Sequence, residues 1–372
     1  MRRAYFPEIT TCNFASDRAT VAPMSPMNPL GGAVVALCSL SVSLLAQTAA
    51  TTTPLWVTDI TIPGAPSAIV PSNRALSIPL LKPADYQGTV RSVDTSTSFS
   101  IAGATFGAGQ FATAAAPRLV RVKNSATAAH VGRFFLITGN TPTQVTVDLT
   151  GSGLAAVSAA VSVGDSVEIS PANTIGSIFG NPPPFKAGLT ADDGDNLLLW
   201  NGISWDSYYW TGTVGSPVNI WKRLGNLDKS NTVIFPDDGV FIVRRGTTPI
   251  TITLSGSVPS STEQSTIPAA GATFLANRFP TDTTLGALGL QALPGWLAGD
   301  TANSADTVLL WNNTSGAWDT YYWTGTAGTP NNIWKRTGNI NRANTVISAG
   351  TAVFITHGGA EVTLIQGLPY TP

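Results

Sequence analysis

The chain has 372 residues, of which only 11% are charged, and its 20 Lys and Arg nearly balance its 21 Asp and Glu. Typical soluble proteins carry about 25% charged residues. Charges so few and so evenly balanced give no basic surface, so we expect no nucleic-acid partner. The length allows two or three domains, each with a core of its own.

The N-terminal region carries a candidate export signal. Residues 30–46 form an uncharged apolar run, LGGAVVALCSLSVSLLA, and a polar stretch of small residues, QTAATTT, follows at once. This order is typical of a signal peptide. We therefore predict a signal peptide over residues 1–46, with the true start near Met24 to Met27. An N-terminal membrane anchor is the alternative, although the apolar run is short for a membrane span.

The cysteines indicate an exported protein without disulfide bonds. Cys12 and Cys38 both precede the predicted cleavage site, so the mature chain would contain no cysteine. Such a chain is not a disulfide scaffold. We expect export to the extracellular space, the cell surface or the periplasm, and no integral membrane span once the signal peptide is removed.

Residues 47–170 predict an N-terminal β domain. Short runs rich in Val, Ile, Thr and Phe alternate with Gly, Pro, Asn and Ser, a pattern that favours strands over helices. The six clearest runs are YQGTVRSV, TSFSIAG, PRLVRV, RFFLITGN, TQVTVDLT and DSVEIS. Six short strands predict a small antiparallel barrel or sandwich.

An internal duplication dominates the rest of the chain. Residues 205–233 and 318–346 are identical at 20 of 29 aligned positions. Weaker similarity extends upstream, which predicts two homologous antiparallel β domains at residues 171–280 and 281–372. In the first copy we expect strands at NLLLW, WDSYYWT, IWKRL, TVIF, GVFIVRR and ITITLSG, with one turn at Asp237-Asp238-Gly239. The whole protein is then mainly β.

A fainter similarity joins the start of the chain to the end of the first copy. STIPAAGATFLANRFP at residues 265–280 resembles ITIPGAPSAIVPSNRALSIP at residues 60–79, and the second copy has no such tail. We hypothesise that the segment after Trp56 supplies an edge strand to one of the later sheets.

The aromatic block of each copy supplies the candidate binding residues. Side chains alternate along a strand, so WDSYYW would project large rings from both faces. The structural interpretation is that one face fills the core while the other covers a neighbouring strand through aromatic pairs. The alternative is a platform on which sugar rings stack while Asp accepts hydroxyl hydrogen bonds. The candidate residues are Trp205, Asp206, Tyr208, Trp210 and Trp221 in the first copy and Trp318, Asp319, Tyr321, Trp323 and Trp334 in the second.

Signals for catalysis and metal binding are weak. Asp192, Asp193 and Asp195 lack the spacing of a calcium loop, and we expect a turn there. The repeated IWKR motif places two cations beside a Trp, which predicts a cation over the ring, with an anion clamp as the alternative. His357 has no histidine counterpart in the first copy, which predicts a lone surface histidine. We predict no catalytic residues, no metal ligands and no cofactor.

The motifs together resemble a known family. GRFFLITGNTPTQVTVDL, ANTIGSIFG and the YYW…IWKR…NTVIFPDDGVFIVRR block are similar to sequences of an uncharacterised family of secreted, β-rich proteins common in verrucomicrobial bacteria. The likeness covers nearly the whole mature chain. It implies export and a β-rich fold, and it assigns no activity and no functional residue.

These observations favour an exported, non-enzymatic surface or extracellular protein of structural or adhesion type. A carbohydrate-binding protein that uses the repeated Trp and Tyr residues is the alternative, and a secreted hydrolase is the third interpretation. Repetition adds extent or avidity to a binding or structural module, whereas catalysis gains little from it. The expected partners are cell-surface components or a polysaccharide.

Overall fold

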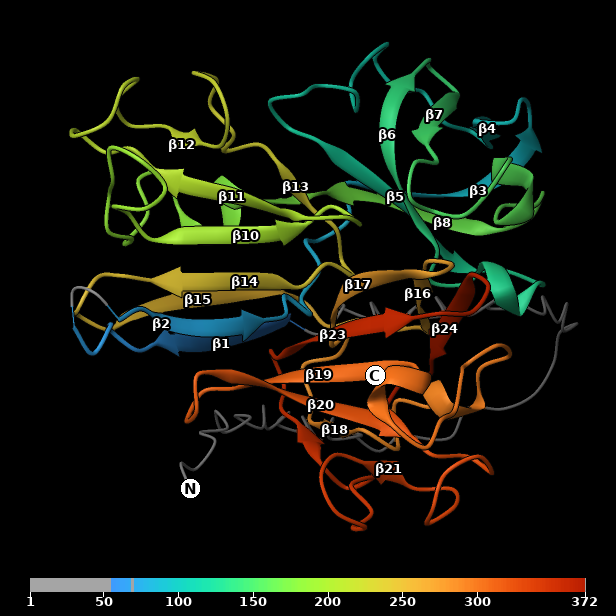
Figure 1. Cartoon of the computed structure of the whole chain (residues 1–372). Coiled ribbons are helices and arrows are strands. Elements are labelled where there is room, and N and C mark those ends of the chain that lie inside the picture. Colours follow the sequence, from blue (N-terminus) through green and yellow to red (C-terminus); the bar gives the residue numbers. More distant parts are fainter. Residues whose placement is uncertain (1–54, 68–69, 372) are drawn as a thin grey trace, which may run out of the picture. The chain divides into compact units, whose positions relative to one another are not determined.

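The computed structural model describes residues 55–67 and 70–371, and strands dominate its regular structure (Figure 1). The mainly β class predicted from the sequence is confirmed. The signal peptide predicted over residues 1–46 lies outside the described residues. No helix within the described ranges combines the length and the apolar character that a membrane span requires.

Six antiparallel strands close into a barrel, in the order β3-β4-β7-β6-β5-β8, and they coincide with the six runs of the sequence analysis. Alternate side chains point inward, among them the fully buried Val145 and Ile169. Closure leaves the barrel without an edge strand. The barrel elements are β3 (Tyr86–Val93), β4 (Ser98–Ile101), β5 (Arg118–Asn124), η1 (Ala128–His130), β6 (Phe134–Asn140), β7 (Gln144–Asp148), η2 (Val157–Ala159) and β8 (Ser166–Pro171).

Repeat 1 contains a five-stranded sheet, in the order β12-β11-β10-β14-β2, and an antiparallel pair, β1-β15. A further short pair, β9-β13, lies beside the helix α1. The side chain of Thr174 caps the first turn of this helix by accepting a hydrogen bond from the backbone N–H of Ser177. The elements are β1 (Leu55–Ile62), β2 (Ser72–Leu76), β9 (Asn173–Thr174), α1 (Ile175–Phe179), β10 (Asn196–Trp200), β11 (Trp205–Trp210), β12 (Trp221–Lys222), β13 (Val233–Ile234), β14 (Val240–Arg244) and β15 (Ile250–Ser257).

Repeat 2 has the same arrangement. Its five-stranded sheet has the order β21-β20-β19-β23-β17, its two-stranded pair is β16-β24, and β18-β22 takes the place of β9-β13. The elements are β16 (Glu263–Ile267), β17 (Gly271–Ala276), β18 (Thr283–Thr284), η3 (Leu290–Ala292), η4 (Ala302–Ser304), β19 (Thr307–Asn312), β20 (Ala317–Trp323), β21 (Trp334–Lys335), β22 (Val346–Ile347), β23 (Ala352–His357) and β24 (Val362–Gln366).

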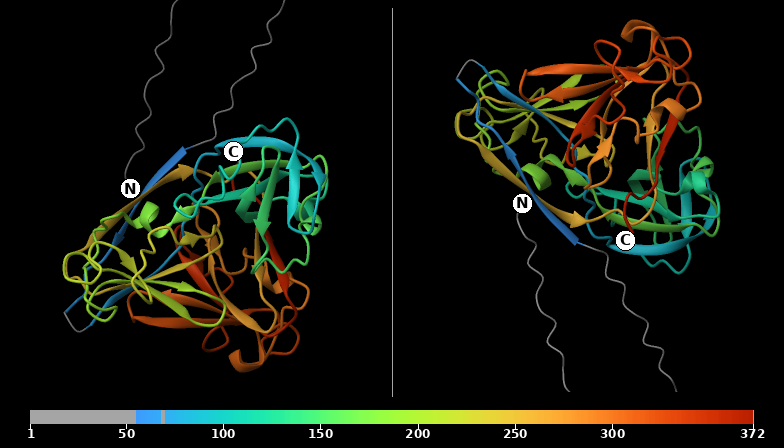
Figure 2. Two further views of the ribbon diagram at one scale, coloured as in Figure 1. Left: turned by 90° about the horizontal axis from the view of Figure 1, so that it is seen from above. Right: turned by 90° about the horizontal axis from the view of Figure 1, so that it is seen from below.

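The strand pairing divides the chain differently from the expected boundaries. β1 and β2 precede the barrel in sequence but pair with β15 and β14 of repeat 1, so the hypothesis that this segment joins a later sheet is confirmed. Figure 2 shows β1, in blue, alongside β15. β16 and β17, expected at the end of the first copy, pair with β24 and β23 of repeat 2. The barrel is therefore inserted into repeat 1, after β2.

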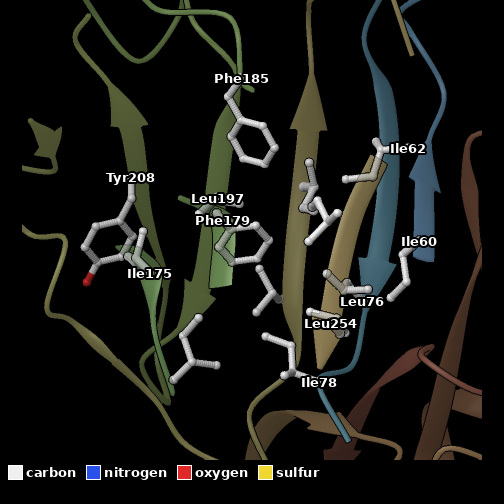
Figure 3. Close-up of a cluster of buried hydrophobic side chains, with 14 of the residues drawn as sticks. Ile60, Ile62, Leu76, Ile78, Ile175, Phe179, Phe185, Leu197, Tyr208 and Leu254 are labelled. Atoms are coloured by element: carbon white, nitrogen blue, oxygen red, sulfur yellow. The ribbon is translucent and has the colours of Figure 1, made fainter. Parts of the chain in front are cut away.

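Each repeat encloses its own core. In β15, Ile250, Ile252 and Leu254 are buried while the residues between them are exposed, which is the period of a strand with one face inward. All three belong to the core of repeat 1 together with Phe179 and Leu197. Figure 3 shows Leu254 across this core from Phe179. The equivalent core in repeat 2 is built around Trp334 and the inward residues of β19 and β23.

Candidate functional site

The aromatic strand of each repeat uses both of its faces for packing. In β11, Tyr208 and Trp210 belong to the core of repeat 1, whereas Trp205 joins a separate cluster that both repeats contribute to. The counterparts in β20 are Tyr321 and Trp323 in the core of repeat 2 and Trp318 in the shared cluster. The second face of each strand thus covers the other repeat.

The shared cluster, which we call the inter-repeat interface, follows an approximate twofold relation. Trp200 of repeat 1 lies 5.0 Å from Phe354 of repeat 2 between ring centroids, at an interplanar angle of 82°. The counterpart pair, Trp311 and Phe241, lies at 5.0 Å and 87°. Edge-to-face pairs of this kind add about 0.5–1.5 kcal/mol each beyond the area they bury.

The two candidate tryptophans of the interface make the same kind of contact. Trp205 lies 5.2 Å from Phe274 and 5.8 Å from Phe354. Trp318 lies 5.5 Å from Phe241, nearly parallel to it. Phe241 and Phe274 are 7% and 2% exposed, so this face of the sheets is closed by the partner repeat. These two rings are engaged in packing between the repeats.

Two indole hydrogen bonds cross the interface and involve the fifth strand of each sheet. Trp200 Nε1 donates to the carbonyl of Ala272 in β17, at 2.8 Å, and Trp311 Nε1 donates to that of Asn73 in β2, at 3.0 Å. Strands β2 and β17 therefore hold the repeats together as well as completing their own sheets. Trp200 and Trp311 were not among the candidate residues predicted from the sequence, although both lie at matching places in the duplicated strands.

The other candidate tryptophans belong to the repeat cores. Trp221 and Trp334 are both 0% exposed. Trp221 Nε1 donates to the carbonyl of Gly180 at 2.9 Å, and Trp334 Nε1 donates to Gln291 Oε1 at 3.3 Å. Their neighbours in the core are Trp210 and Trp323, respectively.

The charged residues of the motifs pair with each other. Arg223 forms an ion pair with Asp206, and Arg336 forms the equivalent pair with Asp319. Both arginines are more than a third exposed, and such surface pairs contribute about 0–1 kcal/mol. The two lysines of IWKR donate to backbone carbonyls instead. The expected cation over the Trp ring is not formed, because each cation has an oxygen partner.

A buried aspartate at the start of the first core strand has a different partner in each repeat. Asp195 is 0% exposed and forms an ion pair with Arg244, while Asp306 Oδ2 lies 2.7 Å from His357 Nδ1. The prediction of a surface histidine was wrong, since His357 is only 3% exposed. Arg244 and His357 occupy the same place beside β10 and β19, and each faces the carboxylate that its repeat buries.

Neither histidine is arranged as a free base. His357 Nε2 lies 2.7 Å from the carbonyl oxygen of Ala360, so both ring nitrogens face oxygen acceptors. His130 is 7% exposed and its Nδ1 lies 3.2 Å from Asp165 Oδ2. Within residues 55–67 and 70–371, no three His, Cys, Asp or Glu side chains lie close enough to hold a metal ion. Asp193 accepts hydrogen bonds from Thr190, which gives the expected turn.

The barrel joins repeat 2 through a buried ionic network. Arg121 of the barrel pairs with Glu168 at 3.1 Å and also with Glu263 of β16, which in turn pairs with Arg278. All four residues are 9% exposed or less. Gln264, the next residue of β16, donates from Nε2 to the carbonyls of Ala129 and Val131 in the barrel.

A cleft of about 730 Å³ lies where the barrel, repeat 1 and repeat 2 meet. Its lining includes Asp237 and Asp238, from the turn between β13 and β14. Burial raises the pKa of Asp238 to about 8, and the adjacent Asp237 adds to this shift. Burial also raises the pKa of Asp237, against the opposing charges of Arg278 and Arg133. The sequence predicted a turn here and no site, although the two acids occur in one copy only.

Comparisons with known proteins add no assignment. A scan against protein-family models gives no match. Neither a search of curated proteins nor a search of solved structures gives a match.

Proposed function

We propose that the protein is an exported, non-enzymatic structural or adhesion protein in which the duplicated aromatic strands join two β repeats into one rigid body. The family of secreted β-rich proteins that its motifs resemble, and a location outside the cytoplasm, are parts of this proposal. Its partners would be cell-surface components or a polysaccharide.

The observation that supports this proposal most is the inter-repeat interface. Seven rings from both repeats pack there: Trp200, Trp205, Phe241, Phe274, Trp311, Trp318 and Phe354. Six of these rings form three equivalent pairs in the two copies, whereas Phe274 of β17 has Ala75 of β2 as its counterpart. The demand that the two copies share is therefore packing. A sugar platform would instead need the faces of Trp205 and Trp318 open to solvent, and their rings lie against phenylalanines of the other repeat.

The experiment has two parts, location and ligand. Mass spectrometry of the mature N-terminus in fractionated cells should find the chain cleaved near Ala46 or Ala49 and outside the cytoplasm. A full-length chain in the cytoplasm would contradict export. A glycan array with the purified protein should give no signal that depends on the candidate rings. Glycan binding that Trp205→Ala or Trp318→Ala abolishes in a folded variant would replace this proposal with the carbohydrate-binding alternative.

A further inference from the structure

The cleft between the barrel and the two repeats contains a pair of acidic residues that repeat 2 lacks. The backbone of Asp237 accepts a hydrogen bond from Ala276 N–H at 2.9 Å, and the backbone of Gly350 accepts the equivalent bond from Ser77 N–H at 2.9 Å. Gly350 and Thr351 thus stand where repeat 1 has Asp237 and Asp238. The backbone contact itself does not require carboxyl groups, because repeat 2 makes it with Gly350, at a φ of 75°, in the place of Asp237.

The two carboxyl groups are unfavourable for the stability of repeat 1. Asp238 Oδ2 accepts one hydrogen bond, from the backbone N–H of Phe235 at 2.9 Å. Neither aspartate makes an ion pair with any residue in the described ranges. Both aspartates are half-buried, and adjacent carboxyl groups in such a place resist ionisation, since desolvation and mutual repulsion both disfavour the charge. Groups that weaken a fold and occur once are more readily explained by binding than by packing.

A second acceptor lines the same cleft without a partner. Gln264 is only 3% exposed and lines the cleft. Its Nε2 donates to the carbonyls of Ala129 and Val131, which fixes the amide, and Oε1 has no donor within the described part of the chain. A buried acceptor without a donor costs about 1–3 kcal/mol. The cleft therefore offers an acceptor without a donor at Gln264 Oε1, and its one lining arginine, Arg133, has a buried Nε without an acceptor in the described part of the chain.

The rest of the lining favours an organic cation. The lining includes five acidic side chains, of which Asp206 is already paired with Arg223, and one arginine. The aromatic residues Trp200, Tyr208 and Phe235 also line the cleft. Carboxylates attract an ammonium group, and aromatic faces attract the same charge with its alkyl carbons. A bare metal ion fits less well, because no three acidic or histidine side chains of the described residues converge on a point. The volume falls within the range of small-molecule sites, about 300–1,000 Å³.

We propose that this cleft binds a small organic cation of the alkyl-ammonium class, with Asp237 and Asp238 as counter-charges and Gln264 Oε1 as an acceptor for an N–H group. The cleft adjoins the inter-repeat interface, since Trp200 and Ala272 line both, but Asp237, Asp238 and Gln264 are not part of the aromatic cluster. Ligand binding by these three residues therefore stands or falls independently of the structural function proposed above.

The test is calorimetric titration of the full chain with 1,4-diaminobutane above pH 8, where Asp238 is ionised. We expect one saturable site with a Kd on the order of 1 mM or tighter. The Asp237→Asn/Asp238→Asn variant keeps the shape of both side chains and should weaken binding at least about 30-fold. The matched control, Asp192→Asn/Asp193→Asn, removes two adjacent acids from an exposed turn and should bind as the parent does.

Four results would overturn the proposal. One is the absence of saturable binding by the parent chain; another is unchanged binding by the cleft variant, shown by its circular dichroism and melting profile to be folded. The third is equal binding of 1,4-butanediol, which has the same carbon chain without charge and would indicate a site for neutral hydroxyl compounds. Titration with CaCl₂ completes the set, and displacement of the diamine by calcium at equal concentration would assign the site to a metal ion instead.

Discussion

Repeat 1 and repeat 2 share strand order, core tryptophans and interface rings, yet they differ at the residues that carry buried charge. Repeat 1 pairs Asp195 with Arg244, where repeat 2 pairs Asp306 with His357. Repeat 1 alone has Asp237 and Asp238 in its β13–β14 turn. Features held in common maintain the architecture, and features present once are candidates for function. The barrel is a further difference between the repeats, because it is inserted into repeat 1 alone and forms one wall of the cleft.

The largest expected effect comes from removing the strands that precede the barrel. Deletion of residues 55–80 takes β1 from β15 and β2 from β14. We expect repeat 1 to lose its cooperative unfolding transition, because its core loses Ile60, Ile62 and Leu76 and its sheet gains an open edge. Differential scanning calorimetry checks this. The matched deletion, residues 263–276, should act on repeat 2 instead. A melting profile unchanged by the first deletion would refute the shared architecture.

The next effect distinguishes the two buried aspartates. Asp195→Ala leaves the Arg244 guanidinium buried without its partner, which should cost about 3–5 kcal/mol of unfolding free energy. Asp306→Ala should cost less, about 1–3 kcal/mol, because it removes a hydrogen-bond partner of a buried imidazole, whereas Asp195→Ala leaves a buried guanidinium, which is always charged, without its counter-charge. Urea denaturation of both variants measures the difference. Equal costs would show that the substitution of histidine for arginine has no energetic consequence.

A smaller effect concerns pH and repeat 1 alone. The pKa of Asp238 is raised from 3.8 to about 8 in the folded protein, so the folded state holds this proton more tightly than the unfolded chain does. Its contribution to stability is complete below the ordinary pKa and is lost as pH rises through about 8. We expect Asp238→Asn to reduce the decline in stability between about pH 5 and about pH 8, by at most about 1.4 kcal/mol per pH unit. Urea titrations across this range measure it, and Asp192→Asn is the control. An unchanged slope would contradict the burial of an ionisable pair at this turn.

Much of the fold could be predicted from the sequence. The six barrel strands and the strands of each repeat follow alternation and turn residues, which are local signals. The membership of β1 in repeat 1 could be inferred only from the likeness between residues 60–79 and 265–280. The barrel between β2 and the rest of its sheet separates paired strands by more than a hundred residues, and no local pattern encodes such a pairing.

The site could be predicted only in part. The aromatic strand WDSYYW indicated rings on two faces, but the sequence cannot show that the second face meets the other repeat. His357 was expected at the surface because the alignment gave it no histidine counterpart. The role it shares with Arg244 depends on a carboxylate some fifty residues away. The cleft collects residues from three parts of the fold, so its existence depends on tertiary structure. Its one sequence signal is that Asp237 and Asp238 have no acidic counterpart in the second copy.

The central claim is that the duplicated rings bind the repeats to each other, and a double-mutant cycle on Phe241 and Trp318 tests it most directly. Each residue is replaced by Leu alone and together, and unfolding free energies are compared. The two rings belong to different repeats with centroids 5.5 Å apart, so we predict a coupling energy of about 0.5–1.5 kcal/mol. The equivalent cycle on Trp205 and Phe354 should give a similar value. Coupling energies of zero in both cycles, with each single variant folded, would contradict the account.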